Sequence, residues 1–266
     1  MPTRPLLLEA RRLWEELARA PRSFPPGGGV TVTVSPESAL CPPGWVGVVA
    51  LGGSALVTVP AETAAAPVRT ALAGLPAEAL VDEASLRAVL PVAGVLGPAA
   101  LAYVSPGGFR PVSGPAAVER LPGDHPALRA LEEAAGREEA GEAALDDITS
   151  AAFVVREHGR VVAAAGHRSW PRRTAHLSVL TAPEARGRGL ARAAASAAVA
   201  DALAAGLLPQ WRARHPASRR VAAALGFEEL GTQLSLELSR NPAAPQGLSS
   251  HSRLPCAASL RAATGA

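Results

Sequence analysis

Apolar and polar residues alternate over one stretch of the chain, and a helical pattern follows after a short break. Between Ala175 and Thr181, positions 175, 177 and 179 are apolar and their neighbours are mostly more polar, which predicts a strand with at least one buried face. Pro183 ends this strand. The alanine-rich segment from Leu190 to Ala205 closes at Gly206, which predicts a helix that a glycine terminates.

The first 104 residues carry patterns of their own and predict an N-terminal α/β domain, 1–104. The predicted order is helix, strand, hairpin, two helices and strand: Glu9–Arg19, Val30–Val34, Trp45–Ala50 with Ala55–Val59, Ala61–Ala73, Asp82–Leu90 and Leu101–Val104. The hairpin is placed at Gly52-Gly53, because paired glycines favour a tight turn between strands.

A stretch rich in proline and glycine, 105–125, predicts a linker to a second domain, 126–240. Apart from the strand and helix described first, this domain is expected to contain two helices, a hairpin, a strand, a short helix and a closing hairpin: His125–Ala135, Glu138–Leu145, Ala152–Glu157 with Val161–His167, Leu207–Arg214, Ala217–Leu225 and Glu228–Leu238. The tail 241–266 has no period and predicts disorder.

The amino-acid composition limits the classes of function that the chain can have. The chain is 48% hydrophobic and 18% charged, which is typical of a globular protein with a buried core. It contains no lysine, and its net charge is only +3 although the pI is about 9.6. Because no dense basic block with interleaved aromatic residues is present, we expect no nucleic-acid partner.

The cysteines and the apolar segments of the sequence indicate the cellular compartment of the protein. Cys41 and Cys256 lie far apart and have no metal-ligand or redox spacing, so we expect neither a disulfide framework nor a metal site. The leucines at 6–8 are too few for a signal peptide, and no apolar run approaches the ~18 residues of a membrane span. A cytoplasmic protein without a membrane partner is the expectation.

The residues between the predicted strand and helix have the chemistry of a phosphate site. Arg186, Gly187, Arg188 and Gly189 stand directly before the helix, whose first backbone amides have no intrahelical partner and carry positive dipole charge. The glycines let the backbone approach a ligand closely, and Arg192 adds a third cation. We name residues 186–189 the phosphate loop.

Two common phosphate motifs fit this loop poorly. A P-loop requires a lysine, which the chain lacks. The dinucleotide fingerprint requires a third glycine and an acidic residue about twenty positions on. Ala191 and Arg192 follow the second glycine, and the acid near that distance is Asp201, inside the predicted helix.

The spacing Arg-x-x-Gly-x-Ala behind Leu-Thr-Ala-Pro resembles instead the pyrophosphate loop of the GNAT superfamily of acyl-CoA-dependent N-acetyltransferases. The resemblance covers roughly Val112 to Ser239, is strongest from His176 to Phe227, and includes the superfamily's Leu-Gly-Phe before the closing segment. It implies a mixed α/β (α+β) fold whose mostly antiparallel sheet is flanked by helices. The N-terminal half is either a degenerate GNAT-like copy or an α/β extension that covers the sheet.

The resemblance implies transfer of the acetyl group of acetyl-CoA to a primary amine, on a small molecule or a protein N-terminus, by direct attack and without a metal. It places the pyrophosphate on residues of the loop and helix start, and the pantetheine arm on the main chain of the strand. These residues are Arg186, Gly187, Arg188, Gly189, Leu190, Ala191 and Arg192, and then Val179, Leu180 and Thr181. The amine acceptor is not indicated, and monomer and homodimer both stay open.

The residues that handle protons depart from the superfamily's pattern. Ala222 stands where many members have a tyrosine that protonates the departing thiolate. His215 stands where many have asparagine, and Gln210 where a subset has a glutamate base. His176 and His215 are candidate bases, because imidazole titrates near neutral pH; a structural role is the alternative for each. Glu157 and His167 are weaker candidates. The missing acid leaves a catalytically weak or inactive acyl-CoA-binding module as the alternative function.

Overall fold

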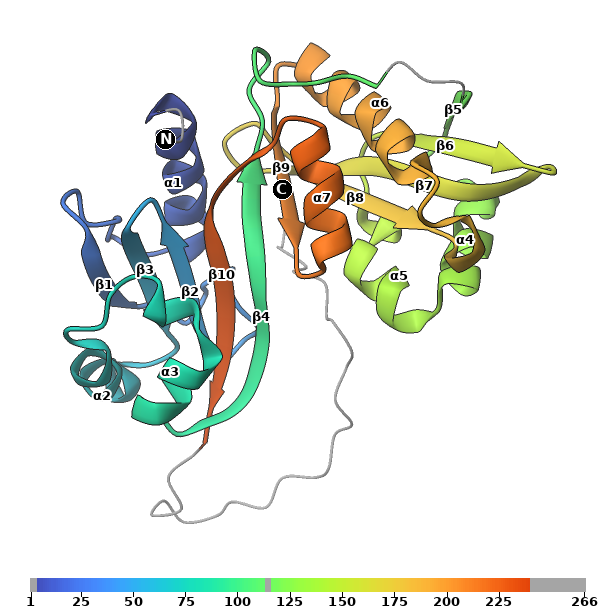
Figure 1. Ribbon diagram of the computed structural model, residues 1–266. Helices are drawn as coiled ribbons and strands as arrows, with labels where there is room; N and C mark the ends of the chain where they lie inside the picture. Colours follow the sequence, from blue (N-terminus) through green and yellow to red (C-terminus); the bar gives the residue numbers. More distant parts are fainter. Residues whose placement is uncertain (1–3, 113–115, 240–266) are drawn as a thin grey trace. The chain divides into compact units, whose positions relative to one another are not determined.

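The computed structural model describes residues 4–112 and 116–239 (Figure 1). The predicted disordered tail, 241–266, lies outside these residues. The helices are α1 Arg4–Ala18, α2 Glu62–Leu72, α3 Glu83–Val89, α4 Pro126–Ala135, α5 Arg137–Ala143, α6 Leu190–Ala204 and α7 Pro216–Ala224, with 3₁₀ turns η1 Ala79–Val81, η2 Leu145–Asp147 and η3 Pro183–Ala185. The strands are β1 Gly29–Val34, β2 Val46–Leu51, β3 Ser54–Val59, β4 Val92–Tyr103, β5 Val118–Leu121, β6 Ala152–Glu157, β7 Arg160–Trp170, β8 Thr174–Thr181, β9 Leu208–Ala213 and β10 Glu228–Leu238.

Most predicted elements are confirmed, and three differ. Strand β4 begins at Val92, well before the predicted Leu101. The prediction missed its first half because Gly94 and the Gly97-Pro98 pair interrupt the apolar pattern there. Strand β5 lies inside the predicted linker. The predicted closing hairpin is wrong, since β10 is one continuous strand. Gly231 marks a close approach rather than a turn, because a Cβ there would lie 1.8 Å from the carbonyl oxygen of Ala50.

The chain divides into two compact units that differ from the predicted division at 105–125. Of the described residues, unit 1 holds those up to Leu13 together with Ala100–Leu230, and unit 2 holds Trp14–Ala99 together with those from Gly231 to 239. Each unit therefore consists of two separate stretches of chain. The reason is that residues 231–236 of β10 pair with β2 rather than with the domain that precedes them in sequence.

Unit 2 has a mixed sheet over its own core. β2 and β3 form the predicted hairpin, β1 is parallel to β3, and β10 is antiparallel to β2. All residues of β2 and β3 are buried, and α2 supplies Ala65, Val68 and Leu72 to the core. The turn from β3 into α2 is Pro60-Ala61 and has no glycine, so this strand-to-helix junction lacks a phosphate loop.

Unit 1 contains the stretch that carries the resemblance. Its strands lie in the order β4-β9-β8-β7-β6-β5, and every pair is antiparallel except β8 with β9. Helix α6 lies on one side of β6, β7 and β8, and helices α4 and α5 lie on the other (Figure 1). The alternation of side chains along the strands agrees with this placement of the helices. The His167 ring reaches Asp201 of α6 on one side of the sheet. Ser178, which pairs with the adjacent Gly166, points to the other side and donates to the Ala144 carbonyl oxygen beside α5. The predicted mixed, mostly antiparallel sheet flanked by helices is confirmed.

Candidate functional site

Strands β8 and β9 separate after a short parallel contact. They pair only from Thr174 with Leu208 to His176 with Gln210. Beyond that point β9 pairs with β4, and β8 keeps its pairing with β7. Among the described residues no strand pairs with 177–181 on the side facing β9. This edge therefore offers main-chain groups to an extended ligand, and it contains the predicted pantetheine residues Val179, Leu180 and Thr181.

The phosphate loop follows β8 as the sequence predicts. Gly187 and Gly189 have φ of 74° and 80°, the region that favours glycine, and Gly189 is the N-cap of α6. A Cβ on either glycine would meet nothing within 4 Å, so the space in front of the loop is open. The amides of the first turn of α6, which includes Leu190, Ala191 and Arg192, have no side-chain cap and present an anion-binding end.

The arginines of the phosphate loop are held by carboxylates from neighbouring elements. Arg188 makes two hydrogen bonds to Glu157 of β6, at 2.6 and 2.7 Å, which raise the pKa of its guanidinium. Arg186 pairs with Glu139 of α5 and also approaches the Thr181 carbonyl oxygen at 3.4 Å. Glu139 was not predicted, and Glu157 was predicted only as a weak candidate base. Within the described residues Arg192 has no ion-pair partner.

A phosphate-bearing, extended ligand fits these residues. The open space before the two glycines would accept the anion, and the arginines flank it. The Thr181 hydroxyl at the end of β8 is buried and makes no hydrogen bond among the described residues. An orphaned buried hydroxyl is costly, so a ligand beside β8 would improve its environment.

His176 lies at the point where β8 and β9 separate. Its ring stacks on Trp170, with centroids 4.2 Å apart and planes within 10°, and its Nδ1 lies 2.5 Å from Oε1 of Gln210. Because a carbonyl oxygen only accepts, Nδ1 is the protonated nitrogen and Nε2 has the lone pair. Burial, aided by the charge of Arg212, lowers the pKa of His176 to about 3. The ring is therefore neutral at pH 7, and it is a poorer proton acceptor than the sequence suggests.

His215 occupies a different environment. It is the N-cap of α7, its side chain is 66% exposed, and its Nε2 lies 3.3 Å from Glu142 of α5. Glu142 also accepts a hydrogen bond from Arg214 at 2.6 Å. Burial raises the pKa of Glu142, but the bond and charge of Arg214, with the charges of His215 and Arg212, outweigh it and lower the pKa. Glu142 is a site residue that the sequence analysis missed.

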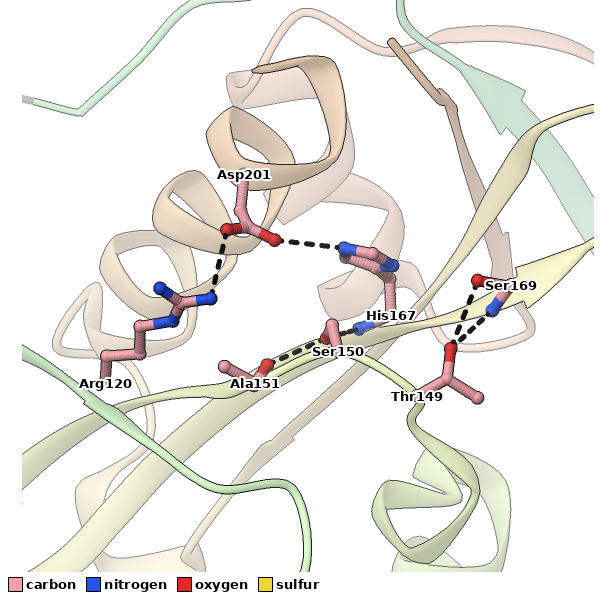
Figure 2. Close-up of polar contacts among 7 residues, drawn as sticks. All are labelled: Arg120, Thr149, Ser150, Ala151, His167, Ser169 and Asp201. Atoms are coloured by element: carbon pink, nitrogen blue, oxygen red, sulfur yellow. Dashed lines mark hydrogen bonds and ion pairs between the residues drawn. The ribbon is translucent and has the colours of Figure 1, made fainter. Parts of the chain in front are cut away.

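His167 lies on the other side of the sheet from His176. Its side chain is 6% exposed, and its Nε2 lies 3.3 Å from Asp201 of α6, which Arg120 approaches at 3.8 Å (Figure 2). The His167 amide donates to Ser150 Oγ at 2.8 Å. His167 pairs with Leu177 of β8, but its ring faces α6.

Two further residues of β9 and α7 lie in the core. Ala222 is 3% exposed and lies in the unit 1 core, so α7 supplies no acid at this position. Trp211 is a core residue, bonded to Ser218 and in edge contact with Phe227 at 5.4 Å. No group of three potential metal ligands exists among the described residues. The described helices also include none with the length and hydropathy to cross a membrane.

Comparison with known proteins assigns one segment of the chain to a family. A family profile described as GNAT acetyltransferase matches residues 150–232, the segment from the start of β6 to β10. No curated protein matches the chain.

Several solved structures are similar to the chain. An acetyltransferase of the GNAT family from Novosphingobium aromaticivorans DSM 12444 is 26% identical, with a TM-score of 0.43, over 55% of this chain and 65% of that one. A GCN5-related N-acetyltransferase from Kribbella flavida is 22% identical, with a TM-score of 0.44, over 56% and 61%. A phosphinothricin acetyltransferase from Sinorhizobium meliloti, in complex with AcCoA, is 23% identical, with a TM-score of 0.36, over 50% and 93%.

The chain thus spans less than two thirds of the first two of these proteins. The family match falls on the strands, loop and helix that form the candidate site. Residues 150–232 thus form a segment of the GNAT acetyltransferase family.

Proposed function

We propose that this chain transfers the acetyl group of acetyl-CoA to a primary amine, on a small molecule or a protein N-terminus. The observation that carries the proposal is the open, glycine-lined phosphate loop at the start of α6. It directly follows a strand edge that no strand in the described part of the chain covers. Bound acetyl-CoA would supply a thioester carbon for direct attack by the amine. Every other part of the reaction falls to the chain's own residues.

Two sets of residues would hold the cofactor. The pyrophosphate set is the loop and first turn, where the amides and guanidiniums lie: Arg186, Gly187, Arg188, Gly189, Leu190, Ala191 and Arg192. The main chain of Val179, Leu180 and Thr181 would pair with the pantetheine arm and present an amide to the thioester oxygen, an arrangement of the oxyanion-hole type.

Proton handling follows from the two histidines. With Nδ1 bonded to Gln210, His176 offers the Nε2 lone pair and would orient a neutral amine by accepting one of its hydrogens. Its low pKa makes it a poor store for the proton, which we assign to solvent near the exposed His215. A thiolate leaving group, with a thiol pKa of about 8.5, requires no acid at Ala222.

The experiment is a calorimetric titration of the wild type with acetyl-CoA, beside Gly189→Glu and Gly74→Glu. Both glycines have positive φ, 80° and 82°, and open space at Cβ, so the backbone strain is matched. We expect binding in the wild type and in Gly74→Glu, and loss in Gly189→Glu, because the new carboxylate fills the phosphate site. Equal binding by all three proteins would disprove the assignment of the loop.

A second candidate function is an acyl-CoA-binding module without catalysis, which the buried Ala222 favours. It predicts the same binding but no release of CoA with any amine, and an amine panel therefore separates the two. The cytoplasm and a monomer or homodimer remain our proposals for compartment and assembly.

A further inference from the structure

The side of unit 1 that carries His176 is rich in arginine. Arg168 lies opposite His176 in the β7–β8 pairing, and Arg212 lies two residues after Gln210 on β9, so all four side chains are on one face of the sheet. The charges of Arg212 and Arg168 both act on the His176 ring. Arg214 follows at the end of β9.

Two carboxylates lie beside these guanidiniums. Asp147 pairs with Arg168 at 3.0 Å, and Glu142 is shared by Arg214, His215 and Arg212. Arg168, Arg212 and Arg214 thus gather where β8 and β9 separate. Because this region is partly desolvated, its guanidiniums attract an anion more strongly than an exposed cluster would.

Gln210 contributes a buried hydrogen-bond donor beside these guanidiniums. Its side chain is completely buried, and Nε2 has no hydrogen-bond partner among the described residues, because Oε1 is the atom that meets His176. A buried amide N–H without an acceptor is costly. An oxyanion placed between Gln210 and Arg212 would satisfy it.

We propose that the acceptor amine also carries a carboxylate, and that Arg212, with Gln210, binds this group; the inference rests on the acetyl transfer proposed above. Positions 210 and 212 of one strand are only about 6.5 Å apart. The amine would lie beside His176 and the carboxylate beside Arg212, so the two groups are separated by few bonds. The substrate class is that of α-amino acids and similarly short amino carboxylates.

The test compares matched acceptors. Each of the common α-amino acids is assayed against its own carboxamide by release of CoA thiol, with KM expressed as neutral amine. The proteins are the wild type, Arg212→Met, Arg212→Lys and Arg87→Met. Arg87, which pairs with Glu83 on α3 of unit 2, controls for loss of one arginine elsewhere, and calorimetry with acetyl-CoA monitors the cofactor site in every protein.

We expect the wild type to acetylate at least one amino acid with a KM about 10-fold or more below that of its amide. A charge-assisted hydrogen bond to the carboxylate changes affinity by about this factor. Arg212→Met should raise the KM of the acid about 10- to 100-fold and leave that of the amide nearly unchanged. The KM of the acid in Arg212→Lys should lie between those of the wild type and Arg212→Met, since lysine keeps the charge but loses the planar guanidinium fork. Arg87→Met should match the wild type.

Other outcomes overturn the proposal. Equal KM values for acid and amide, an equal rise of both in Arg212→Met, or acetylation of simple amines alone would each exclude a carboxylate site at Arg212. If the wild type binds acetyl-CoA but acetylates none of the amino acids, this inference fails and the cofactor site stands. If the wild type does not bind acetyl-CoA, the proposed function fails as well.

Discussion

The imidazole of His176 stacks on the indole of Trp170, with centroids 4.2 Å apart and ring planes 10° from parallel. The ring is thus covered on one face and hydrogen-bonded at Nδ1 to Gln210. Both contacts fix its orientation, and desolvation with the charge of Arg212 keeps it neutral. A histidine in this state can accept a hydrogen bond at Nε2, and it titrates far from neutral pH.

This environment predicts a loss of stability in mild acid. The pKa of His176 is about 3 in the folded protein and 6.5 as its ordinary value, so below the latter the unfolded chain binds a proton that the folded chain does not. The free energy of unfolding should therefore fall as the pH drops from about 6.5 toward 3. Urea unfolding at pH 7 and at about pH 5 would show a smaller acid loss in His176→Gln than in the wild type. Identical losses would contradict the low pKa.

The ion pair of Arg188 with Glu157 predicts competition at the phosphate loop. Without a ligand, Glu157 holds the guanidinium through two hydrogen bonds, and a pyrophosphate must displace or share it. Glu157→Gln should therefore bind acetyl-CoA more tightly, by up to about 5-fold, which is the scale of an exposed ion pair. Arg188→Gln should bind it more weakly.

The matched control is Glu83→Gln, which releases Arg87 from a similar exposed pair at 2.8 Å on α3. It should leave the affinity unchanged in calorimetry at one ionic strength. Tighter binding by both variants would mean that net charge, and not the release of Arg188, is responsible.

The contact between His167 and Asp201 predicts a purely structural effect. Asp201→Ala would leave the buried Nε2 of His167 without its partner, at a cost of about 1–3 kcal/mol in the free energy of unfolding. Arg120→Ala should cost less than about 0.5 kcal/mol, since its contact is long and exposed. Urea unfolding measures both. A change in acetyl-CoA affinity by Asp201→Ala would show that this contact also supports the phosphate loop.

Local patterns predict the central part of the site well. The alternation from Ala175, the two loop glycines and the glycine after the helix define β8, the phosphate loop and α6 within a residue or two. These signals are local, because strand periodicity and helix termination depend on neighbouring residues.

Long-range pairing sets the limits of that prediction. β10 returns to β2, where Gln233 donates to the Leu40 carbonyl at 2.6 Å across 193 residues, and no local pattern specifies this return. The same holds for the site: Arg186 meets Glu139 across 47 residues, and His176 meets Gln210 across 34. Residue types near the loop indicated a phosphate, but the counterions and the neutral state of His176 required the folded arrangement.

The position of Ala222 predicts that restoring the superfamily's tyrosine would not restore an acid. Ala222 is 3% exposed and packs in the unit 1 core with Leu225 and Phe227. A tyrosine there adds an aromatic ring to a filled space, and overpacking of this kind costs typically 1–3 kcal/mol. Ala222→Tyr should therefore lower the free energy of unfolding in urea and should not raise kcat.

The control is Ala223→Tyr, one residue further along α7 on its exposed side. It should unfold within about 0.5 kcal/mol of the wild type, because surface substitutions away from special contacts have small effects. A rise in kcat for Ala222→Tyr with unchanged stability would mean that α7 shifts to admit the ring. The chain would then have lost its acid by one substitution, whereas the packing seen around Ala222 indicates that the surrounding core has adapted to a small residue.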